Sequence, residues 1–541
     1  MAGGTPGEAR AVQEGILRRQ SARESSARTY ARALPIVPVR ARGLTIEGAD
    51  GRRYLDCLSG AGTLALGHNH PVVLEAIRGV LDSGAPLSVL DLATPVKDAF
   101  VTELFSTLPP GLAAHARVQF CGPAGTDAVE AALKLVRTAT GRSGVLAFTG
   151  AYHGMTAGAL AASGGAQDVR VTRLPYPQDY RCPFGLGGPS GAELAARWTE
   201  TLLDDPKSGV PLPAGMILEP VQGEGGVIPA PDDWLRRMRR LTADRSIPLI
   251  ADEVQTGVGR TGAFWAVDHS GITPDVMVLS KAIGGSLPLA VIVYRDDLDT
   301  WQPGAHAGTF RGNQLAMAAG TATLAYVREN ALAERAATLG SRMLTQLADL
   351  TREYAWVGDV RGRGLMIGIE LVNPEPDRTT PAERGPAGAP GIPDDPGTGR
   401  PQATGIPDGP VAGHPGATGA PTILDGPGPG PGAWAAPGVP GGPTAAPTRP
   451  VPRRVPYPAA PELAAAVQRE CLRRGLIVEL GGRHASVVRL LPPLTISDEQ
   501  VTAVLDRLTD AIAAAVRHQT THGPTHGPHR QRRPDSAQPT G

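Results

Sequence analysis

The sequence predicts an α/β protein with a mainly parallel central sheet, helices on both faces of that sheet, and a smaller α+β domain. Two observations indicate this fold class. Short, continuous apolar runs at 145–148, 249–251 and 276–280 lie between Gly and Pro breakers, as strands buried on both faces do. Segments with the length and spacing of helices, such as 127–137 and 192–203, lie between such runs, which is the order of a parallel α/β sheet.

Length and composition exclude several classes of protein. The 541 residues suffice for several domain-sized units, and Lys plus Arg balance Asp plus Glu at 52 each, so nothing indicates a nucleic-acid partner. No apolar run approaches the roughly 18 residues of a membrane span, so no membrane partner is expected. The four cysteines are far apart and form no CxxC motif, which fits reduced thiols in a cytoplasmic protein.

The N-terminal 28 residues are polar and are expected to be flexible. They contain no apolar segment of a secretory signal, and three glutamates argue against an organelle transit peptide. Residues 37–60 alternate apolar and polar side chains around a turn signal at 49–51, which predicts a short meander of strands. A helix is predicted after Pro71, and a second one over 95–108.

A strand–turn–helix unit over 117–137 offers an anion site. Gly125 and Thr126 stand immediately before the helix, whose free N–H groups and dipole favour a phosphate. Gly125 would let the backbone approach a ligand closely, and Thr126 would add a hydroxyl donor. A simple helix cap explains the same residues equally well.

The strand at 145–148 is followed by Tyr152 and His153. An aromatic ring at the end of a strand can lie flat against a planar ligand. The alternative is that Tyr152 is a core aromatic and His153 a structural hydrogen-bonding residue. A further strand at 214–218 ends in a Gly-rich segment that contains Glu224.

Two apolar runs each end in an ionisable residue: 249–251 runs into Asp252, and 276–280 runs into Lys281. Because ligands of parallel sheets bind at the carboxyl ends of the strands, both side chains would enter one crevice. Pyridoxal phosphate (PLP) needs this combination, an amine for its carbonyl and an anion beside its ring nitrogen. From spacing alone, a solvated lysine and an aspartate that caps a turn are the better explanation.

After the predicted strand at 289–294, helices are expected at 314–330 and 332–354, followed by a strand region at 360–372. Residues 374–457 are dominated by Pro and Gly and cannot bury enough apolar surface to fold, so a disordered insertion is expected. The fold is expected to resume with a helix at 461–474, two strands, and a last helix at 497–516. A disordered tail is expected at 518–541. No metal site is expected.

Several motifs in this order resemble the class III aminotransferases of the PLP-dependent fold type I. The two central motifs are ADEVQTGVGRTG at 251–262 and LSKAIGGSLP at 279–288. Within that family, the sequences of four segments are most similar to those of the diaminobutyrate–2-oxoglutarate aminotransferases. These segments are 117–142, 147–165, 308–316 and 489–497. The resemblance covers about 29–371 and 461–515.

The resemblance implies a cofactor and the residues that hold it. Lys281 would bind PLP covalently and act as the catalytic base, and Asp252 would be the anion at the ring nitrogen. It further implies phosphate binding by Gly125 and Thr126, ring contacts by Tyr152 and His153, and a contact of Gln255 with the ring hydroxyl. The matching threonine of the family serves the other subunit's cofactor, so Thr309 implies a homodimer with shared active sites.

The resemblance also implies a substrate switch, in which Arg489 binds the α-carboxylate of glutamate and Glu224 masks it in the other half-reaction. The alternative role for Arg489 is a surface salt bridge formed from a strand. The expected reaction converts L-2,4-diaminobutyrate and 2-oxoglutarate to aspartate 4-semialdehyde and glutamate, run towards diaminobutyrate for ectoine, a siderophore or a peptide product. Alternatives are another ω-aminotransferase, acting on ornithine, acetylornithine or 4-aminobutyrate, and a non-catalytic scaffold.

The domain division expected from the resemblance places a large PLP-binding domain at 67–330. The smaller domain would combine an N-terminal part, 29–66, with a C-terminal part made of 331–373 and 458–517. The flexible N-terminus, the insertion and the tail lie outside these two domains.

Overall fold

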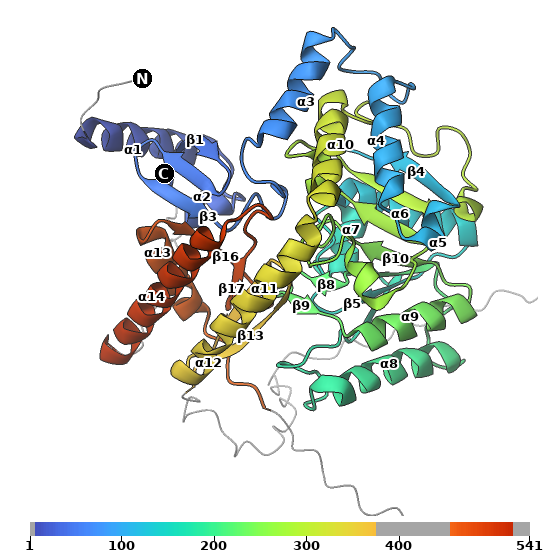
Figure 1. The fold of residues 1–541 in the computed structure, drawn as a ribbon. Coiled ribbons are helices and arrows are strands. Elements are labelled where there is room, and N and C mark those ends of the chain that lie inside the picture. The colour runs from blue at the N-terminus through green and yellow to red at the C-terminus, as the bar shows by residue number, and fades with distance from the viewer. Residues whose placement is uncertain (1–5, 375–454, 523–541) are drawn as a thin grey trace, which may run out of the picture. The chain divides into compact units, whose positions relative to one another are not determined.

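The computed structural model of the protein describes residues 6–374 and 455–522 (Figure 1). The insertion expected at 374–457 therefore lies outside the described residues except at its two ends. The tail expected at 518–541 lies outside them from residue 523 onward. The last helix is longer than expected and reaches His522.

The large sheet has seven strands in the order β4-β12-β11-β10-β7-β5-β6. Strand β12 is antiparallel to both of its neighbours, whereas the other recorded pairings are parallel, so the sheet is mainly parallel as predicted. The strands are β4 (Ala116–Phe120), β12 (Val291–Arg295), β11 (Val276–Leu279), β10 (Leu249–Asp252), β7 (Gly215–Leu218), β5 (Val145–Phe148) and β6 (Val171–Leu174).

Successive side chains of the central strands enter two different hydrophobic cores. Leu249 and Ala251 belong to the core on one face of the sheet, while Ile250 between them belongs to the core on the other face. In β11, Met277 likewise belongs to the first core and Val278 to the second. Because both faces are covered, successive positions of these strands are apolar up to Asp252 at the end of β10, which explains the continuous runs in the sequence.

Helices cover both faces. Helices α6 (Gly125–Thr140) and α7 (Ala157–Ser163) pack on one face and supply most of its alanine-rich core. On the other face, α9 (Asp232–Asp244) contacts β10, and α8 (Gly188–Asp204) packs against α9. Helix α9 carries four arginines, yet it buries Trp234, Leu235 and Met238. It is thus an amphipathic helix and not a fully solvated one.

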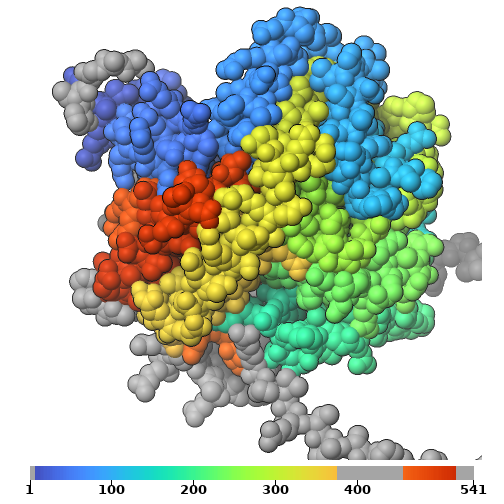
Figure 2. Space-filling view, viewed as in Figure 1, coloured from blue at the N-terminus to red at the C-terminus, as the bar shows by residue number. Residues whose placement is uncertain are grey.

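Helix α10 (Gln314–Glu329) leads from the large sheet to α11 (Leu332–Ala348). Figure 2 shows α10 and α11 as a yellow ridge between the C-terminal helices and α4 (Pro95–Ser106). Helix α10 contacts both α3 (Pro71–Asp82) and α4, and α11 contacts α14 (Asp498–His522). Short helices α5 (Pro110–Ala113) and α12 (Leu350–Glu353) follow α4 and α11.

A four-stranded sheet joins the two ends of the chain. Strands β1 (Pro38–Arg42), β2 (Thr45–Gly48) and β3 (Arg53–Asp56) form the predicted N-terminal meander. Strand β3 then pairs in parallel with β15 (Leu476–Ile477), which is more than 400 residues away in the sequence. Residues near both termini therefore build one sheet.

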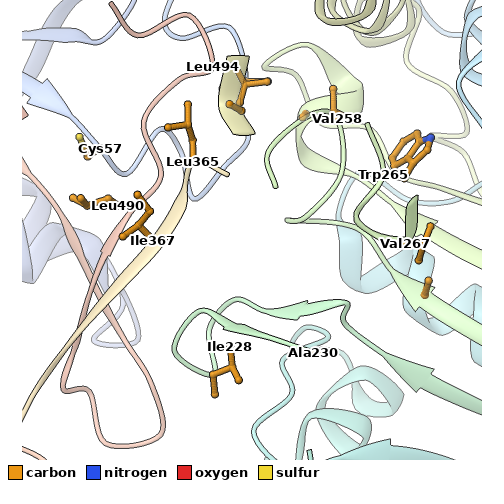
Figure 3. Packing of buried hydrophobic residues seen from close by; sticks show 14 of the residues in the cluster. Cys57, Ile228, Ala230, Val258, Trp265, Val267, Leu365, Ile367, Leu490 and Leu494 are labelled. Atoms are coloured by element: carbon orange, nitrogen blue, oxygen red, sulfur yellow. The ribbon is translucent and has the colours of Figure 1, made fainter. Parts of the chain in front are cut away.

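The second small sheet is antiparallel, in the order β13-β14-β17-β16. The single strand region expected at 360–372 is in fact a hairpin, β13 (Val357–Arg363) and β14 (Met366–Leu371), turned at Gly364 with φ +56°. Strand β14 pairs with β17 (Val487–Leu490), which pairs with β16 (Glu479–Gly481). Figure 3 shows Ile367 of β14 beside Leu490 of β17, with Cys57 next to them. Helix α13 (Pro461–Arg473) covers this sheet.

For the described part of the N-terminus, the expectation that residues 1–28 are flexible is corrected by helix α1 (Pro6–Arg23). The segment is rich in Ala, Arg, Glu and Gln, which have high helix propensity, and it contains an Arg10–Glu14 ion pair at i,i+4 spacing. The Gln13 side chain also reaches Asp50 at the β2–β3 turn, 3.4 Å away. A short helix, α2 (Tyr30–Ala33), leads into the meander.

Across the described part of the chain, no helix combines the length and apolarity that crossing a membrane requires. Within the same residues, no three side chains of His, Cys, Asp or Glu gather as a metal-binding group.

Candidate active site

Asp252 and Lys281 lie at the carboxyl ends of two adjacent strands. Asp252 is the last residue of β10 and stands opposite Val278 of the parallel strand β11. Lys281 follows two residues after β11 and begins the short 3₁₀ helix η2 (Lys281–Gly284). The Lys281 backbone has φ +51°, an uncommon conformation for a residue with a side chain. The structure thus places the carboxylate and the amine at one edge of the sheet, as predicted from the two apolar runs.

The electrostatic surroundings of Lys281 favour a neutral amine. Burial lowers the pKa of Lys281, and the charges of Glu224 and Asp252 only partly oppose this effect. An amine with a lowered pKa can act as a nucleophile and as a base nearer to neutral pH.

His153 holds the Asp252 carboxylate. The His153 Nδ1 and Asp252 Oδ2 atoms lie 2.7 Å apart, and both side chains are buried. Burial lowers the pKa of His153, but the hydrogen bond and charge of Asp252 outweigh it, so the pKa is raised. The other carboxylate oxygen accepts a hydrogen bond from the Val254 N–H, 3.1 Å away. His153 therefore contacts Asp252, while a direct contact with a cofactor stays a prediction.

The N-terminus of α6 lies at the same edge of the sheet. A Cβ atom on Gly125 would be 3.0 Å from the Val254 side chain and 3.5 Å from Ser280, so glycine lets the helix end approach the loops after β10 and β11. Asp127 accepts a hydrogen bond from the Ala124 N–H at 3.0 Å and thereby caps the helix. The cap alternative consequently explains Asp127 but leaves the first-turn N–H groups without intrahelical partners.

The Thr126 hydroxyl is held in place by a neighbouring loop. It lies 2.6 Å from the Thr156 hydroxyl and accepts a hydrogen bond from the Thr156 N–H at 3.1 Å. Gly154 packs directly against the Thr126 side chain, and a Cβ atom at Gly154 would collide with it. This arrangement orients one hydroxyl at the helix N-terminus, where a phosphate would bind.

Tyr152 and Gln255 flank the cluster. Tyr152 is 44% exposed, so it is not a core aromatic, and its N–H donates to Glu219 Oε1 at 2.9 Å. Burial raises the pKa of Glu219 to about 7. The Gln255 amide donates to the Ala61 carbonyl at 3.0 Å, which ties the loop after β10 to the N-terminal part of the chain. A contact of Gln255 with a cofactor hydroxyl stays a prediction.

Arg489 is fully buried and does not form the surface salt bridge that was its alternative. Its Nη2 atom lies 2.7 Å from Glu224 Oε2 and 2.6 Å from Glu479 Oε2. Glu479 stands directly opposite Arg489 on the neighbouring strand β16. The Nε and Nη1 atoms of Arg489 have no hydrogen-bond partner among the described residues. A guanidinium with two unpartnered donors is suited to a carboxylate ligand.

Thr309 is not brought into this cluster within one chain. It is exposed, and it lines a surface hollow of about 430 Å³ with Leu87, Leu90 and Phe310. Lys281 and Asp252 do not line this hollow. Phe310 is 76% exposed, so the loop presents an apolar surface beside Thr309.

The residues at the sheet edge fit PLP. They combine an amine with a lowered pKa, a carboxylate held by a buried histidine, and a helix N-terminus beside an oriented hydroxyl. The cofactor has a matching carbonyl, ring nitrogen and phosphate.

Comparison with known proteins identifies the family. The family model "Aminotransferase class-III" matches residues 26–385. The chain belongs to the class III aminotransferases. The predicted fold, PLP-dependent fold type I, is thereby confirmed, and this aminotransferase is also similar in structure to solved members. One is an amine transaminase from an uncultivated Pseudomonas species in its PLP-bound form, with a TM-score of 0.69 and 27% identity, covering 91% of this chain and 98% of that one.

Two relatives match this aminotransferase over most of their length. The diaminobutyrate–2-oxoglutarate aminotransferase of Rhizobium meliloti (strain 1021) is 48% identical over 515 residues, which cover 94% of this chain and 93% of the relative. The protein of the same name from Haemophilus influenzae (strain ATCC 51907 / DSM 11121 / KW20 / Rd) is 41% identical, covering 94% and 97%.

Sequence reasoning missed two charged residues of the site, Glu219 and Glu479. Glu219 follows β7 and fixes the backbone of Tyr152, and Glu479 is the second carboxylate on Arg489. Glu219 could have been found, because it ends an apolar strand as Asp252 does. Glu479 carries no such signal, since a carboxylate in a short strand resembles a solvated residue.

Proposed function

We propose that this aminotransferase transfers the 4-amino group of L-2,4-diaminobutyrate to 2-oxoglutarate, giving aspartate 4-semialdehyde and glutamate. The observation that carries the proposal is the placement of Lys281 and Asp252 at the ends of adjacent parallel strands, beside the N-terminus of α6. The substrates are supported by the two relatives, whose names give diaminobutyrate and 2-oxoglutarate and which are 41% and 48% identical over nearly the whole chain.

Six residues besides Lys281 would hold the cofactor in this proposal. Asp252, positioned by His153, would face the ring nitrogen, and the α6 N-terminus would bind the phosphate. The set from one chain is Lys281, Asp252, His153, Tyr152, Gln255, Gly125 and Thr126, to which Thr309 of a second copy would be added. When bound, PLP supplies an electron-accepting ring that stabilises negative charge on the substrate carbon.

Lys281 is the proton carrier. Its Nζ atom takes the proton from C4 of diaminobutyrate, the carbon that carries the amino group to be transferred. The lowered pKa of Lys281 supports this role, because a neutral amine can accept a proton. The same atom returns a proton to the α-carbon when glutamate forms from 2-oxoglutarate.

Arg489 and Glu224 would adapt the site to two different substrates. In the half-reaction of glutamate, Arg489 binds the α-carboxylate, and its unpartnered Nε and Nη1 atoms support this role. In the half-reaction of diaminobutyrate, Glu224 stays on Arg489, as it does in the structure at 2.7 Å. The pair would thus switch between a closed and an open arrangement.

We further propose a homodimer that works in the cytoplasm. Thr309 would contribute to the cofactor phosphate site of the partner subunit, and its exposed position beside apolar Phe310 and Leu90 supports a contact with a second copy. All four cysteines are free thiols, which supports a reducing compartment.

The test is an absorbance spectrum of the purified protein, loaded with PLP, before and after addition of L-2,4-diaminobutyrate. We expect a visible cofactor band that disappears with diaminobutyrate and returns with 2-oxoglutarate. A band that responds only to ornithine, acetylornithine or 4-aminobutyrate would keep the enzyme class and overturn the substrate. No band after incubation with PLP would contradict the enzyme and favour a non-catalytic scaffold.

A further inference from the structure

Two carboxylates share one guanidinium at the substrate-binding end of the site. Glu224 and Glu479 both approach the Nη2 atom of Arg489, at 2.7 and 2.6 Å. Two carboxylates and one guanidinium give this group a formal charge of −1 (−2 plus +1). The arrangement exceeds what is needed to neutralise Arg489, because one carboxylate would suffice.

The second carboxylate, Glu479, is more deeply buried than the first. Its side chain is 10% exposed, against 31% for Glu224 and 0% for Arg489. Its Oε2 atom has no hydrogen-bond partner among the described residues, although it lies within ion-pair distance of Arg489. Because the single guanidinium of Arg489 is shared between two carboxylates, a further cation beside the buried Glu479 would be favourable, and the position points to a positively charged ligand group.

Glu479 lies close enough to Lys281 for its charge to act on that amine, together with the charge of Glu224. It also forms a hydrogen bond with the Tyr30 side chain. Burial and the neighbouring Glu224 also raise the pKa of Glu479, although Arg489 opposes them. Added positive charge at this point would keep the carboxylate ionised.

The substrates of the proposed reaction differ in where they carry ammonium groups. Diaminobutyrate and aspartate 4-semialdehyde react at C4 and keep an α-ammonium group throughout. Glutamate reacts at its own amino group, and 2-oxoglutarate has none. A spare carboxylate is therefore useful only in the half-reaction of the diamino acid.

We propose that Glu479 determines substrate specificity by binding the α-ammonium group of the donor while Arg489 and Glu224 remain paired. This inference rests on the proposed function, since it assumes a diamino acid as donor. It predicts selection against ω-amino acids that lack an α-amine, because these would leave Glu479 without a cation.

The test compares L-2,4-diaminobutyrate with 4-aminobutyrate, which differ only in the α-amino group. Glu479→Gln keeps the size of the side chain and removes its charge. In the holoenzyme we expect kcat/KM for diaminobutyrate to fall about 10²-fold, mainly through KM, as for a lost buried ion pair. The value for 4-aminobutyrate should change less than about threefold, and the glutamate half-reaction should change as little.

Two further variants keep the test decisive if Glu479→Gln folds poorly. Glu479→Asp retains the charge and should recover part of the preference for diaminobutyrate. Glu370→Gln is the matched control, because Glu370 is a buried carboxylate on strand β14 of the same sheet and is paired with Arg181 and Arg361. It should leave the ratio of the two kcat/KM values unchanged.

The outcomes separate this inference from the proposed function. If wild-type enzyme uses diaminobutyrate and Glu479→Gln lowers kcat/KM equally for both donors and for glutamate, Glu479 only positions Arg489 and the inference is wrong. If wild-type enzyme does not use diaminobutyrate at all, the proposed function fails first, and the inference fails with it.

Discussion

Asp252 and Lys281 have opposite charge requirements, and different neighbours meet them. In the proposed site Asp252 would have to remain an anion beside the ring nitrogen, and His153, whose pKa is raised, forms a hydrogen bond with it at 2.7 Å. Lys281 must lose its proton easily, and burial lowers its pKa. Both effects operate at one sheet edge because the residues come from adjacent strands.

Removing His153 should therefore impair catalysis through Asp252. For His153→Ala we expect kcat to fall about 10- to 100-fold, since a hydrogen bond to a charged group contributes roughly 1.5–3 kcal/mol. Steady-state transamination by the PLP-loaded enzyme measures the effect. His68→Ala is the control, because His68 and Asp56 form a similar pair at 2.8 Å in another part of the chain. An equal fall in kcat for both variants would contradict a specific role of His153.

The buried carboxyl group of Glu253 should make the free energy of unfolding depend on pH. Burial raises the pKa of Glu253 to about 7, although the Thr256 hydroxyl and the Val267 N–H donate to its carboxylate. In the unfolded chain the carboxyl loses its proton at the ordinary value of about 4.5, so the folded state becomes relatively less stable as pH rises from there to about 7. The total loss is on the order of 3 kcal/mol.

Glu253→Gln removes this titration. We expect its Tm relative to wild type to be higher at pH 8 than at pH 5, measured by thermal unfolding of the two proteins in parallel. Glu75→Gln, an exposed position on α3, should shift Tm equally at both pH values. A difference between Glu253→Gln and wild type that does not depend on pH would show that Glu253 is ionised throughout.

At the scale of elements, the N-terminus of α6 depends on the loop that carries Gly154. Gly154 has φ +124° and lies against Thr126, so Gly154→Ala should strain the loop and displace the Thr126 hydroxyl. We expect the dissociation constant of PLP to rise about 10- to 100-fold, as for a lost hydrogen bond to a charged phosphate. Fluorescence titration of the apoenzyme with PLP measures this value.

Gly141→Ala is the control that separates the effect of backbone strain in α6 from the effect of displacing the Thr126 hydroxyl. Gly141 ends the same helix with φ +68°, but apart from its two chain neighbours no described residue has an atom within 4 Å of the position of its Cβ. It should destabilise α6 slightly and leave PLP affinity within about twofold. Similar affinities for both variants would contradict the role assigned to Thr126.

The elements that could be predicted are those with an uninterrupted local signal. The strand predicted at 145–148 has the same bounds in the structure, and the runs at 249–251 and 276–280 are β10 and β11, because both faces of these strands are covered. The sequence did not predict that 357–371 forms two strands. The turn between them depends on Gly364, which packs against the backbone of 260–262. Long-range packing of this kind leaves no periodic pattern in the sequence.

The site shows the same division between local and long-range information. The positions of Lys281, Asp252 and the Gly125–Thr126 pair at one sheet edge could be predicted, because each stands at the end of a strand or the start of a helix, whereas their roles were implied only by the family resemblance. Glu479 could not, because its partner Arg489 becomes its neighbour only through the pairing of β16 with β17. Burial turns these two residues from a possible surface pair into a candidate substrate site.

At the scale of the whole described chain, residues far apart in sequence converge around the site. Tyr30 from the N-terminal region interacts with Glu479, and Gln255 reaches Ala61. Strand β3 pairs with β15. The N-terminal part of the chain therefore contributes to the proposed donor site, although it lies outside the large sheet. Thr309, in contrast, is exposed on the surface of a single chain, which suggests that the site is completed by a second copy.

Subunit complementation tests that sharing directly. Lys281→Ala should be inactive, and Thr309→Ala should have low activity through weaker phosphate binding. In a mixed dimer, the subunit that keeps Lys281 would receive its threonine from the Lys281→Ala partner, so one of the two sites would be native. We expect a mixed dimer, isolated by two affinity tags after co-expression, to have about half of the wild-type kcat.

A threonine acting within its own chain predicts the opposite result. The subunit with Lys281 would then also carry the Thr309→Ala change, so the mixed dimer would be no more active than the Thr309→Ala protein. The double variant Lys281→Ala/Thr309→Ala, combined with wild type, is the matched control. In the shared arrangement its wild-type subunit lacks a threonine donor and should be impaired, whereas in the unshared arrangement that subunit should be fully active. If the threonine is shared, the mixed dimer of Lys281→Ala with Thr309→Ala is the more active one. If it is not shared, the mixed dimer of the double variant with wild type is the more active one. The comparison therefore does not depend on the absolute loss caused by either substitution.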